Sequence, residues 1–276
     1  MNRTTSFRIK RVSTLGGVFV KEFQKHFLLG MGVLFFACLL ALAGYGLKFK
    51  SEIDGMKPVA TGELTAGICA VKDAYVNLFL VKTKDGWIAI DSGIHSDEVA
   101  AQMHTLKISP ESVKAVLLTH SDSDHTGAVK LFPNATVFLT KQEEPLVNGR
   151  QFRSFPFHNH LSVAYHVLAS GQLLNIDGRS IKVILVPGHT PGSAVYVVDG
   201  KYLFAGDSMS IQNGHVEPFN RFFNMDSVQQ VRNIPKLARL KGIQEIFTAH
   251  YGVSKEFVKA FELWPTTTVD SSTMAD

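Results

Sequence analysis

The stretch THSDSDHTG, residues 119–127, places two histidines and two aspartates within six residues. It begins at the end of the apolar run Val113–Thr119, whose length predicts a β-strand. Ionisable groups crowded this closely are poorly accommodated unless a cation lies among them. Imidazole and carboxylate are also the donors that divalent metals take, so the stretch predicts a metal site at a strand end.

Three further predicted strands end in residues of the same kind. The candidate ligands are His189, Asp207 and His250, which follow the apolar runs 181–186, 202–205 and 245–248. Residues at strand ends on one edge of a sheet are held with little conformational entropy left to lose. The four strand ends therefore predict one composite site. The alternation of β-like and α-like segments around them predicts a mixed α/β fold.

The composition excludes several broad classes of protein. With 45% hydrophobic and 19% charged residues, the chain is not expected to be disordered, and its two cysteines cannot make a disulfide-stapled scaffold. Residues 1–50 carry eight Lys or Arg and one Glu, a net charge of +7. Residues 51–276 carry 20 basic and 23 acidic residues, a net charge of −3. A nucleic-acid partner is therefore not expected for the body of the protein.

An uncharged apolar run, Phe27–Leu47, lies near the N-terminus and is long enough for a membrane-spanning helix. Six Lys or Arg precede it, and by the positive-inside rule that flank stays in the cytoplasm. This pattern predicts a single-pass membrane protein whose catalytic domain is extracytoplasmic. The alternative is export after cleavage of a signal peptide near Ala43, since Ala41-Leu42-Ala43 fits the small-x-small pattern.

The predicted organisation has five segments. They are a cytoplasmic basic segment (1–26), a transmembrane helix or signal-peptide core (27–47), a linker (48–66), a folded domain (67–264) and a disordered tail (265–276). The linker has Gly and Pro but no sustained period, and the tail is polar with no apolar period.

Five motifs, taken in order, carry a family resemblance. They are IDSG (90–93), THSDSDHTG (119–127), PGHTPGS (187–193), FAGD (204–207) and AHYG (249–252). Their order and spacing resemble the metallo-β-lactamase superfamily, which includes glyoxalase II-like hydrolases. The resemblance covers roughly residues 68–262 and implies an α/β fold, an αββα four-layer sandwich of the metallo-β-lactamase type, with metals at the edge between the two sheets.

The resemblance also implies two divalent metal ions and a set of ligands for each ion. His120, Asp122 and His189 would hold one ion, Asp124, His125 and His250 the other, and Asp207 would bridge them. Asp91 matches an aspartate that supports the site loops. The family usually has a histidine where this chain has Asp122, so the loop is a variant His-x-Asp-x-Asp-His. Carboxylate in place of imidazole leaves open zinc or a harder ion such as manganese or iron.

The function implied is a metal-dependent hydrolase that uses a metal-activated hydroxide, oriented by Asp124, on a small ester, thioester or lactone. Two alternatives remain. One is a phosphodiesterase of the same fold, suggested by Asp122, and the other is a non-catalytic, membrane-tethered metal-binding protein. The expected partners are a small-molecule substrate and a membrane. Four other histidines are candidates for the substrate pocket: His95, His158, His160 and His215.

Overall fold

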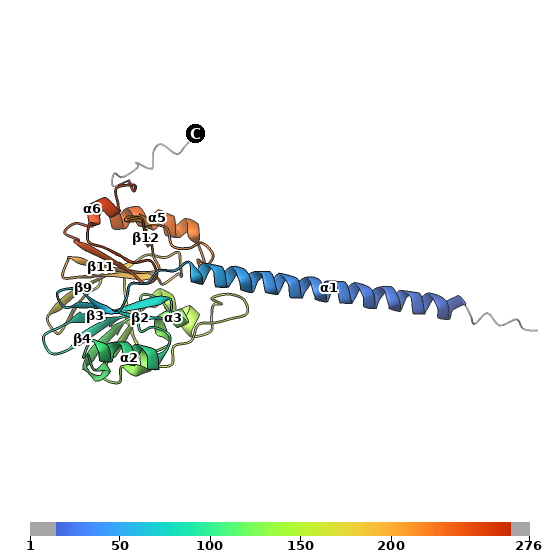
Figure 1. The fold of residues 1–276 in the computed structure, drawn as a ribbon, viewed down its shortest axis with the longest axis horizontal. Helices are drawn as coiled ribbons and strands as arrows, with labels where there is room; N and C mark the ends of the chain where they lie inside the picture. The colour runs from blue at the N-terminus through green and yellow to red at the C-terminus, as the bar shows by residue number, and fades with distance from the viewer. Residues whose placement is uncertain (1–14, 266–276) are drawn as a thin grey trace, which may run out of the picture. The chain divides into compact units, whose positions relative to one another are not determined.

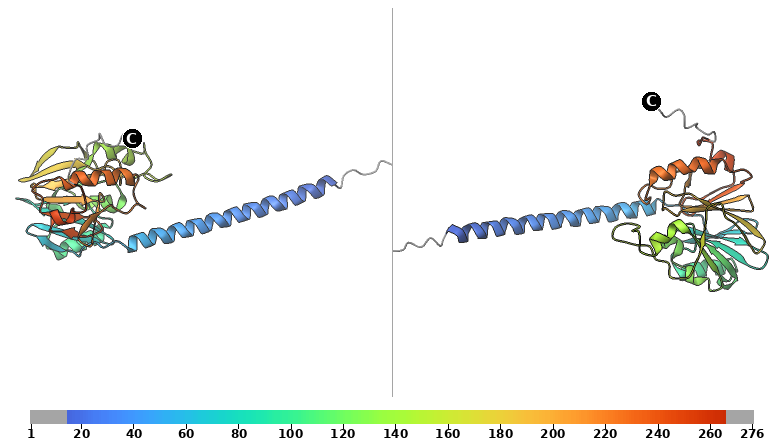
Figure 2. Two further views of the ribbon diagram at one scale, coloured as in Figure 1. Left: turned by 90° about the horizontal axis from the view of Figure 1, so that it is seen from above. Right: turned by 180° about the vertical axis from the view of Figure 1, so that it is seen from behind.

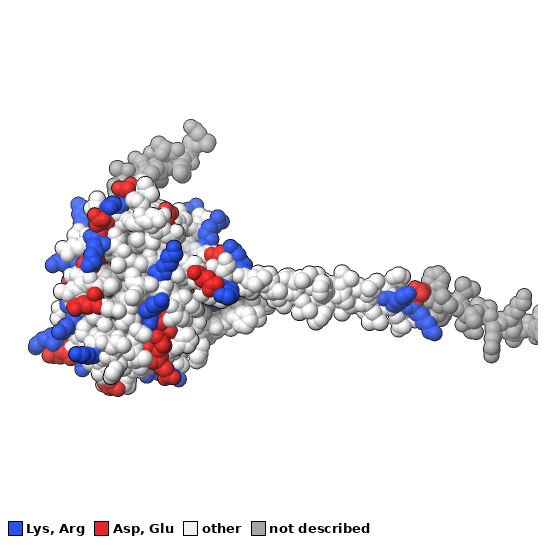
Figure 3. Space-filling view, in the orientation of Figure 1, with Lys and Arg blue, Asp and Glu red and all other residues white. Residues whose placement is uncertain are grey.

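The computed structural model describes residues 15–265, so residues 1–14 of the predicted cytoplasmic segment and residues 266–276 of the predicted tail lie outside the described part. The chain divides into two compact units, Met1–Ile53 and Asp54–Asp276. The first unit is formed by the helix α1 (Leu15–Asp54). Figure 3 shows that most of its length carries no charged atoms. The helix is long and apolar enough to cross a membrane, a test that a signal sequence would also pass.

The helix α1 is longer than the predicted apolar run in both directions. It continues through residues 48–54, which contain no Gly or Pro, and ends before Gly55. Part of the predicted linker therefore has regular secondary structure: residues 48–54 belong to α1, and Gly62–Thr65 form strand β1. A local apolar pattern does not show the true limits of a helix, because residues such as Lys and Glu extend the helix at little cost.

The second unit contains two sheets packed face to face. The first sheet orders its strands β1 (Gly62–Thr65), β2 (Ile68–Asp73), β3 (Val76–Lys82), β4 (Trp87–Ile90), β5 (Val113–Leu117), β6 (Thr136–Thr140) and β7 (His166–Leu168) in sequence. The second has the order β15 (Val253–Ser254), β14 (Glu245–Thr248), β11 (Tyr202–Gly206), β10 (Ala194–Val198), β9 (Arg179–Leu185) and β8 (Leu173–Ile176). A small hairpin pairs β12 (Ser210–Gln212) with β13 (His215–Glu217).

Helices cover the outer faces of the two sheets, as Figures 1 and 2 show. The helix α2 (Ser96–Thr105) covers the first sheet, and α5 (Ser227–Ala238) and α6 (Phe257–Ala260) cover the second. The single-turn helices α3 (Ser123–Thr126) and α4 (Glu144–Val147) and the 3₁₀ turns at 110–112, 129–131 and 141–143 lie in the connections between strands. In Figure 1, α2 lies below the strands β3 and β4, while α5 and α6 lie above β9 and β11. This is the four-layer αββα arrangement that the sequence resemblance implies.

The period of two along the strands explains these layers. In β3, Phe79 and Val81 face the second sheet, whereas Leu78 and Leu80 pack with Val99 of α2. In the second sheet, alternate residues of β10 face inward or pack against α5. Both faces of the central strands β3 and β10 are thus buried, which is why these strands are continuous apolar runs, whereas β8 and β9 expose alternate residues. An aromatic contact links the sheets, since the Phe79 and Phe204 rings lie 5.6 Å apart.

Two helices of the second unit are single turns. The helix α3 ends at Thr126 and is followed by the 3₁₀ turn at 129–131, and α6 has only four residues. Gly127 lies between the first two turns, and a Cβ at this position would lie 2.5 Å from the Ile94 carbonyl oxygen. The close approach of the backbone at the site loop therefore requires a residue without a Cβ at this position.

Candidate metal centre

The strand directions bring the polar strand ends to one edge of the sandwich. The strands β4 and β5 are parallel, so Asp91 and His120 leave the first sheet at the same edge. In the second sheet β11 and β14 are parallel, and β9 runs the same way because both β9 and β11 are antiparallel to β10. His189, Asp207 and His250 therefore also emerge together.

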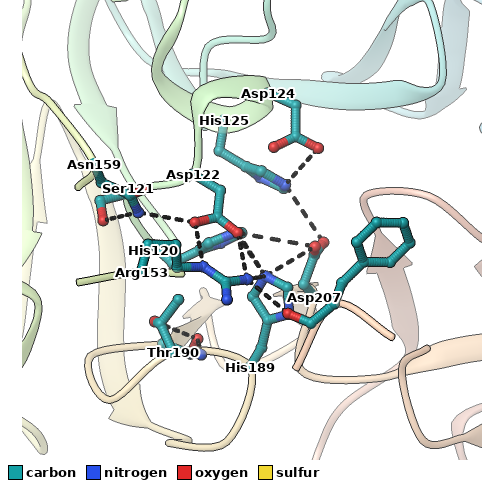
Figure 4. Close-up of polar contacts among 12 residues, drawn as sticks. His120, Ser121, Asp122, Asp124, His125, Arg153, Asn159, His189, Thr190 and Asp207 are labelled. Carbon is teal, nitrogen blue, oxygen red and sulfur yellow. Dashed lines mark hydrogen bonds and ion pairs between the residues drawn. The ribbon is translucent and has the colours of Figure 1, made fainter. Parts of the chain in front are cut away.

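At this edge the side chains form two groups with donor atoms within 4.8 Å of one another: His120, His189 and Asp207, and Asp124, His125 and His250. Asp207 spans the two groups (Figure 4). Its Oδ2 lies 3.4 Å from His189 Nε2, and its Oδ1 lies 3.3 Å from His250 Nε2. We call the first group the first half-site and the second group, with Asp207 Oδ1, the second half-site.

Each of the four imidazoles is held through Nδ1, which leaves Nε2 directed at the centre. His125 Nδ1 lies 2.8 Å from the Asp91 carboxylate, and His250 Nδ1 lies 2.7 Å from the Tyr75 carbonyl oxygen. Carboxylate and carbonyl oxygens only accept, so these Nδ1 atoms carry the proton. His189 Nδ1 faces Asn224 Oδ1 at 3.1 Å, and His120 Nδ1 faces Thr119 Oγ1 at 3.1 Å. Such partners are typical of metal-binding histidines.

Asp91, for which the sequence resemblance implies a supporting role, contacts the loop that follows β5. Besides His125, its carboxylate accepts hydrogen bonds from the Thr119 backbone N–H at 2.7 Å and from the Thr119 hydroxyl at 2.9 Å. Asp91 also adopts a left-handed backbone conformation with φ of 63°. This strained residue ties the end of β4 to the loop that follows β5, which carries four of the candidate ligands.

The centre carries an excess of negative charge that favours a cation. Burial alone would lower the pKa of His250, but Asp207 and Asp124 raise it to about 10. Burial would likewise lower the pKa of His125, which the neighbouring carboxylates of Asp207, Asp91 and Asp124 instead raise well above its ordinary value. For Asp207 burial opposes ionisation, yet the surrounding histidines hold its pKa well below the usual range. Positive charge is therefore stabilised between these groups.

The residues present fit a divalent metal at the second half-site. Asp207 Oδ1 is buried and has no hydrogen-bond partner among the described residues. It points at His125 Nε2 and His250 Nε2, which lie 3.4 Å and 3.3 Å away. A buried carboxylate oxygen left without a donor is costly unless a ligand satisfies it. Two imidazoles and two carboxylates are a donor set that zinc and other divalent ions take.

Asp122 belongs to neither group, although the sequence predicts it as a ligand. Its carboxylate forms a two-pronged ion pair with Arg153, with Nε to Oδ1 and Nη2 to Oδ2 both at 2.7 Å. Burial opposes ionisation of Asp122, but His120, His189 and Arg153 hold its pKa well below the ordinary value. Asp122 is therefore an ionised group whose charge is already paired by a guanidinium.

The four additional histidines have surroundings of their own, and none belongs to either half-site. His95 Nδ1 pairs with Asp73 Oδ1 at 2.8 Å. His158 is exposed and its Nδ1 contacts the Gln151 carbonyl oxygen, while His160 is exposed. His215, on β13, lies 3.5 Å from Glu262. Their predicted role in a substrate pocket stays a prediction.

Two residues that organise the centre were not predicted from the sequence, Arg153 and Glu143. Glu143 is buried and joins the two ligand-bearing loops. Its Oε1 accepts from the Ser121 backbone N–H and hydroxyl at 2.9 Å and 2.6 Å. Its Oε2 accepts from the Thr190 hydroxyl at 2.7 Å and the Gly192 N–H at 2.9 Å. Both residues come from a stretch without apolar period, so no local signal distinguishes them from surface charges.

The pKa of His250 gives a prediction for the chelated protein. Its value of about 10 in the folded state exceeds the ordinary value of 6.5. A group with a raised folded-state pKa contributes stability fully below its unfolded pKa and loses it as the pH rises through the folded one. We expect the melting temperature of the chelated protein to decrease as the pH rises from about 6.5 to about 10. Thermal unfolding across this range, with and without added metal, checks this. A melting temperature that does not change with pH in the presence of chelator would contradict the raised pKa of His250.

Comparison with known proteins agrees with this architecture. A family model described as the metallo-beta-lactamase superfamily matches residues 71–242. A hydroxyacylglutathione hydrolase of Buchnera aphidicola is 29% identical over 181 residues, which cover 63% of this chain and 62% of that protein. One from Prochlorococcus marinus is 31% identical over 160 residues, with 55% and 54% covered. The chain thus spans less than two thirds of the length of either relative.

Among solved structures, a metallo-beta-lactamase family protein from Thermus thermophilus superposes with a TM-score of 0.58 and 21% identity. The match covers 73% of this chain and 79% of that protein. At this identity, the likeness concerns the fold alone.

Proposed function

The chain belongs to the metallo-beta-lactamase superfamily, and from this membership and the geometry of the centre we propose that it is a metal-dependent hydrolase. The proposed substrate is a small ester, thioester or lactone. The relatives named hydroxyacylglutathione hydrolase favour a thioester among these. The observation that carries the proposal is Asp207, whose two oxygens face two groups of candidate metal ligands while Oδ1 has no hydrogen-bond partner in the described chain.

The catalytic chemistry needs no nucleophilic side chain. A divalent ion held by Asp124, His125, His250 and Asp207 would supply a water molecule of lowered pKa and would polarise the substrate carbonyl. The chain's own residues hold and orient the reacting groups. The Nδ1 partners Asp91 and Tyr75 O fix the imidazoles of His125 and His250, so that both present Nε2. Asp124 Oδ2 lies 3.4 Å from His250 Nε2, and we assign it the second role of orienting the attacking water.

We propose zinc as the metal, with manganese or iron as the alternative. The second half-site combines two imidazoles with two carboxylates, a set with more oxygen donors than a histidine-only zinc site. Elemental analysis of protein purified without added metal would distinguish these ions.

The test of the proposed function is hydrolysis by the purified full chain in detergent, on chromogenic esters, thioesters, lactones and phosphodiesters. We expect thioester or lactone hydrolysis that a chelator abolishes and that added metal restores. The same chelator, saturated beforehand with metal, is the control and should leave the activity unchanged. Hydrolysis of phosphodiesters alone would favour the phosphodiesterase alternative. A metal-loaded protein inactive on every substrate would favour the non-catalytic alternative.

We also propose that the helix α1 anchors the protein in a membrane, with the second unit outside the cytoplasm. The support is the net charge of +7 in residues 1–50 and the uncharged run Phe27–Leu47 within the helix. A reporter fused after Asp276 should therefore behave as an exported protein, and cleavage should be tested by sequencing the mature N-terminus. A reporter active only in the cytoplasm would refute this topology, and an N-terminus at Gly44 would replace the anchor with a signal peptide.

A further inference from the structure

The guanidinium of Arg153 lies against the first half-site, as Figure 4 shows. Its Nη2 is 2.7 Å from Asp122 Oδ2 and 3.3 Å from His189 Nε2. The same Nη2 donates to the Phe223 carbonyl oxygen at 2.7 Å. Arg153 is therefore held on three sides, with its charge directed at atoms that a metal in the first half-site would need. An arginine side chain stays protonated at any pH at which the protein is folded.

Asp122 is occupied by donors other than a metal. Its Oδ1 accepts from Arg153 Nε at 2.7 Å and from Asn159 Nδ2 at 2.8 Å. Its Oδ2 accepts from Arg153 Nη2 and lies 3.0 Å from His189 Nε2. A two-pronged guanidinium–carboxylate pair is among the stronger polar contacts in proteins. An ion that used Asp122 as a ligand would have to displace this pair.

The first half-site therefore does not fit a second divalent ion. Metal–nitrogen distances are about 2.0–2.1 Å, so an ion on His189 Nε2 would lie within a few ångströms of Arg153 Nη2. Like charges at that separation repel strongly in a buried site. In the second half-site, by contrast, no hydrogen bond or ion pair joins Asp124, His125 or His250 to a described basic side chain other than the histidines themselves.

We propose that the centre binds one metal ion tightly, in the second half-site, and that Arg153 holds the first half-site as a fixed internal cation. Asp122 then serves as the counter-ion of Arg153 and is not a metal ligand. This inference rests on the proposed metal centre and concerns the occupancy of its two halves. It makes Arg153 a positioning residue that decides the number of bound ions.

The experiment counts metal ions and uses no activity readout. Metal-free full-length protein is titrated with Zn²⁺ alone against a chromogenic chelator, and bound zinc is counted after gel filtration. We expect one tight equivalent in the parent and two in Arg153→Met, because loss of the buried charge strengthens the first half-site by about 100-fold or more. Arg153→Lys keeps the charge and should stay at one equivalent.

Two further variants make the result decisive. Arg153→Gln removes the charge but keeps an N–H donor for Asp122, so it also should bind two equivalents and serves if Arg153→Met does not fold. Arg150→Met is the matched control, because Arg150 is an exposed arginine of the same stretch and should leave one equivalent. Two equivalents of equal affinity in the parent, or a single one in the folded Gln variant, would overturn the inference. A parent that binds no zinc would instead refute the proposed metal centre itself.

Discussion

Replacing Asp207 by asparagine is expected to reduce hydrolysis by more than about 100-fold, beyond the 10–100-fold loss typical of a partner that only supports a ligand. Asp207 is the one side chain whose two oxygens face both half-sites, and its Oδ1 has no other partner among the described residues. Asparagine has the same shape but no charge, and one of its two ends becomes a donor. The measurement is kcat/KM on the best substrate, together with bound metal.

The matched control is Asp97→Asn, which makes the same chemical change at an exposed position of α2. This variant should keep parental activity and metal content. The fold of Asp207→Asn should survive, as shown by circular dichroism, because the buried apolar core between the two sheets does not include Asp207. Parental metal content with full activity in Asp207→Asn would remove Asp207 from the centre and with it the main support for the proposed hydrolase.

Replacing Glu143 by alanine is expected to lower stability more than any single change at a metal-binding side chain. Four donors from two loops converge on its buried carboxylate: the Ser121 N–H and hydroxyl, the Thr190 hydroxyl and the Gly192 N–H. Truncation would leave the Ser121 N–H and hydroxyl and the Gly192 N–H buried without this partner, at a cost of about 3–5 kcal/mol. The Thr190 hydroxyl would keep Ser193 Oγ, which lies 2.8 Å away. For a domain of this size the melting temperature should fall by about 10 °C.

Thermal unfolding in detergent measures this change, with Gln142→Ala as the control because Gln142 is the exposed neighbour. The melting temperature of Glu143→Gln should lie between those of Glu143→Ala and Gln142→Ala. The amide oxygen of the glutamine can accept from the donors of one loop, whereas its NH₂ group faces the donors of the other. The backbone is equally constrained here, because a Cβ on Gly192 would lie 2.3 Å from the Glu143 nitrogen. A melting temperature for Glu143→Ala within 2 °C of the control would show that other contacts hold the two loops.

The elements of the fold that could be predicted are those with a local pattern. The strands β5, β11 and β14 have nearly their predicted limits, because each is a short, largely buried apolar run that is followed by polar residues. The hairpin of β12 and β13 was not predicted, since three-residue strands give too short a period. The true length of α1 was underestimated because polar helix formers continue it beyond the apolar run.

The sequence by itself determined which side chains stand at the strand ends, and strand direction then brought His120, His189, Asp207 and His250 to one edge. Tertiary structure alone decided what surrounds each of them. Arg153 lies 31 positions along the chain from Asp122, in a stretch with no periodic signal, and Glu143 joins loops 22 and 49 positions away. Whether a carboxylate binds a metal depends on whether another cation already lies beside it. The distance from the carboxylate to such a cation is set by the folding of distant loops, not by spacing along the chain.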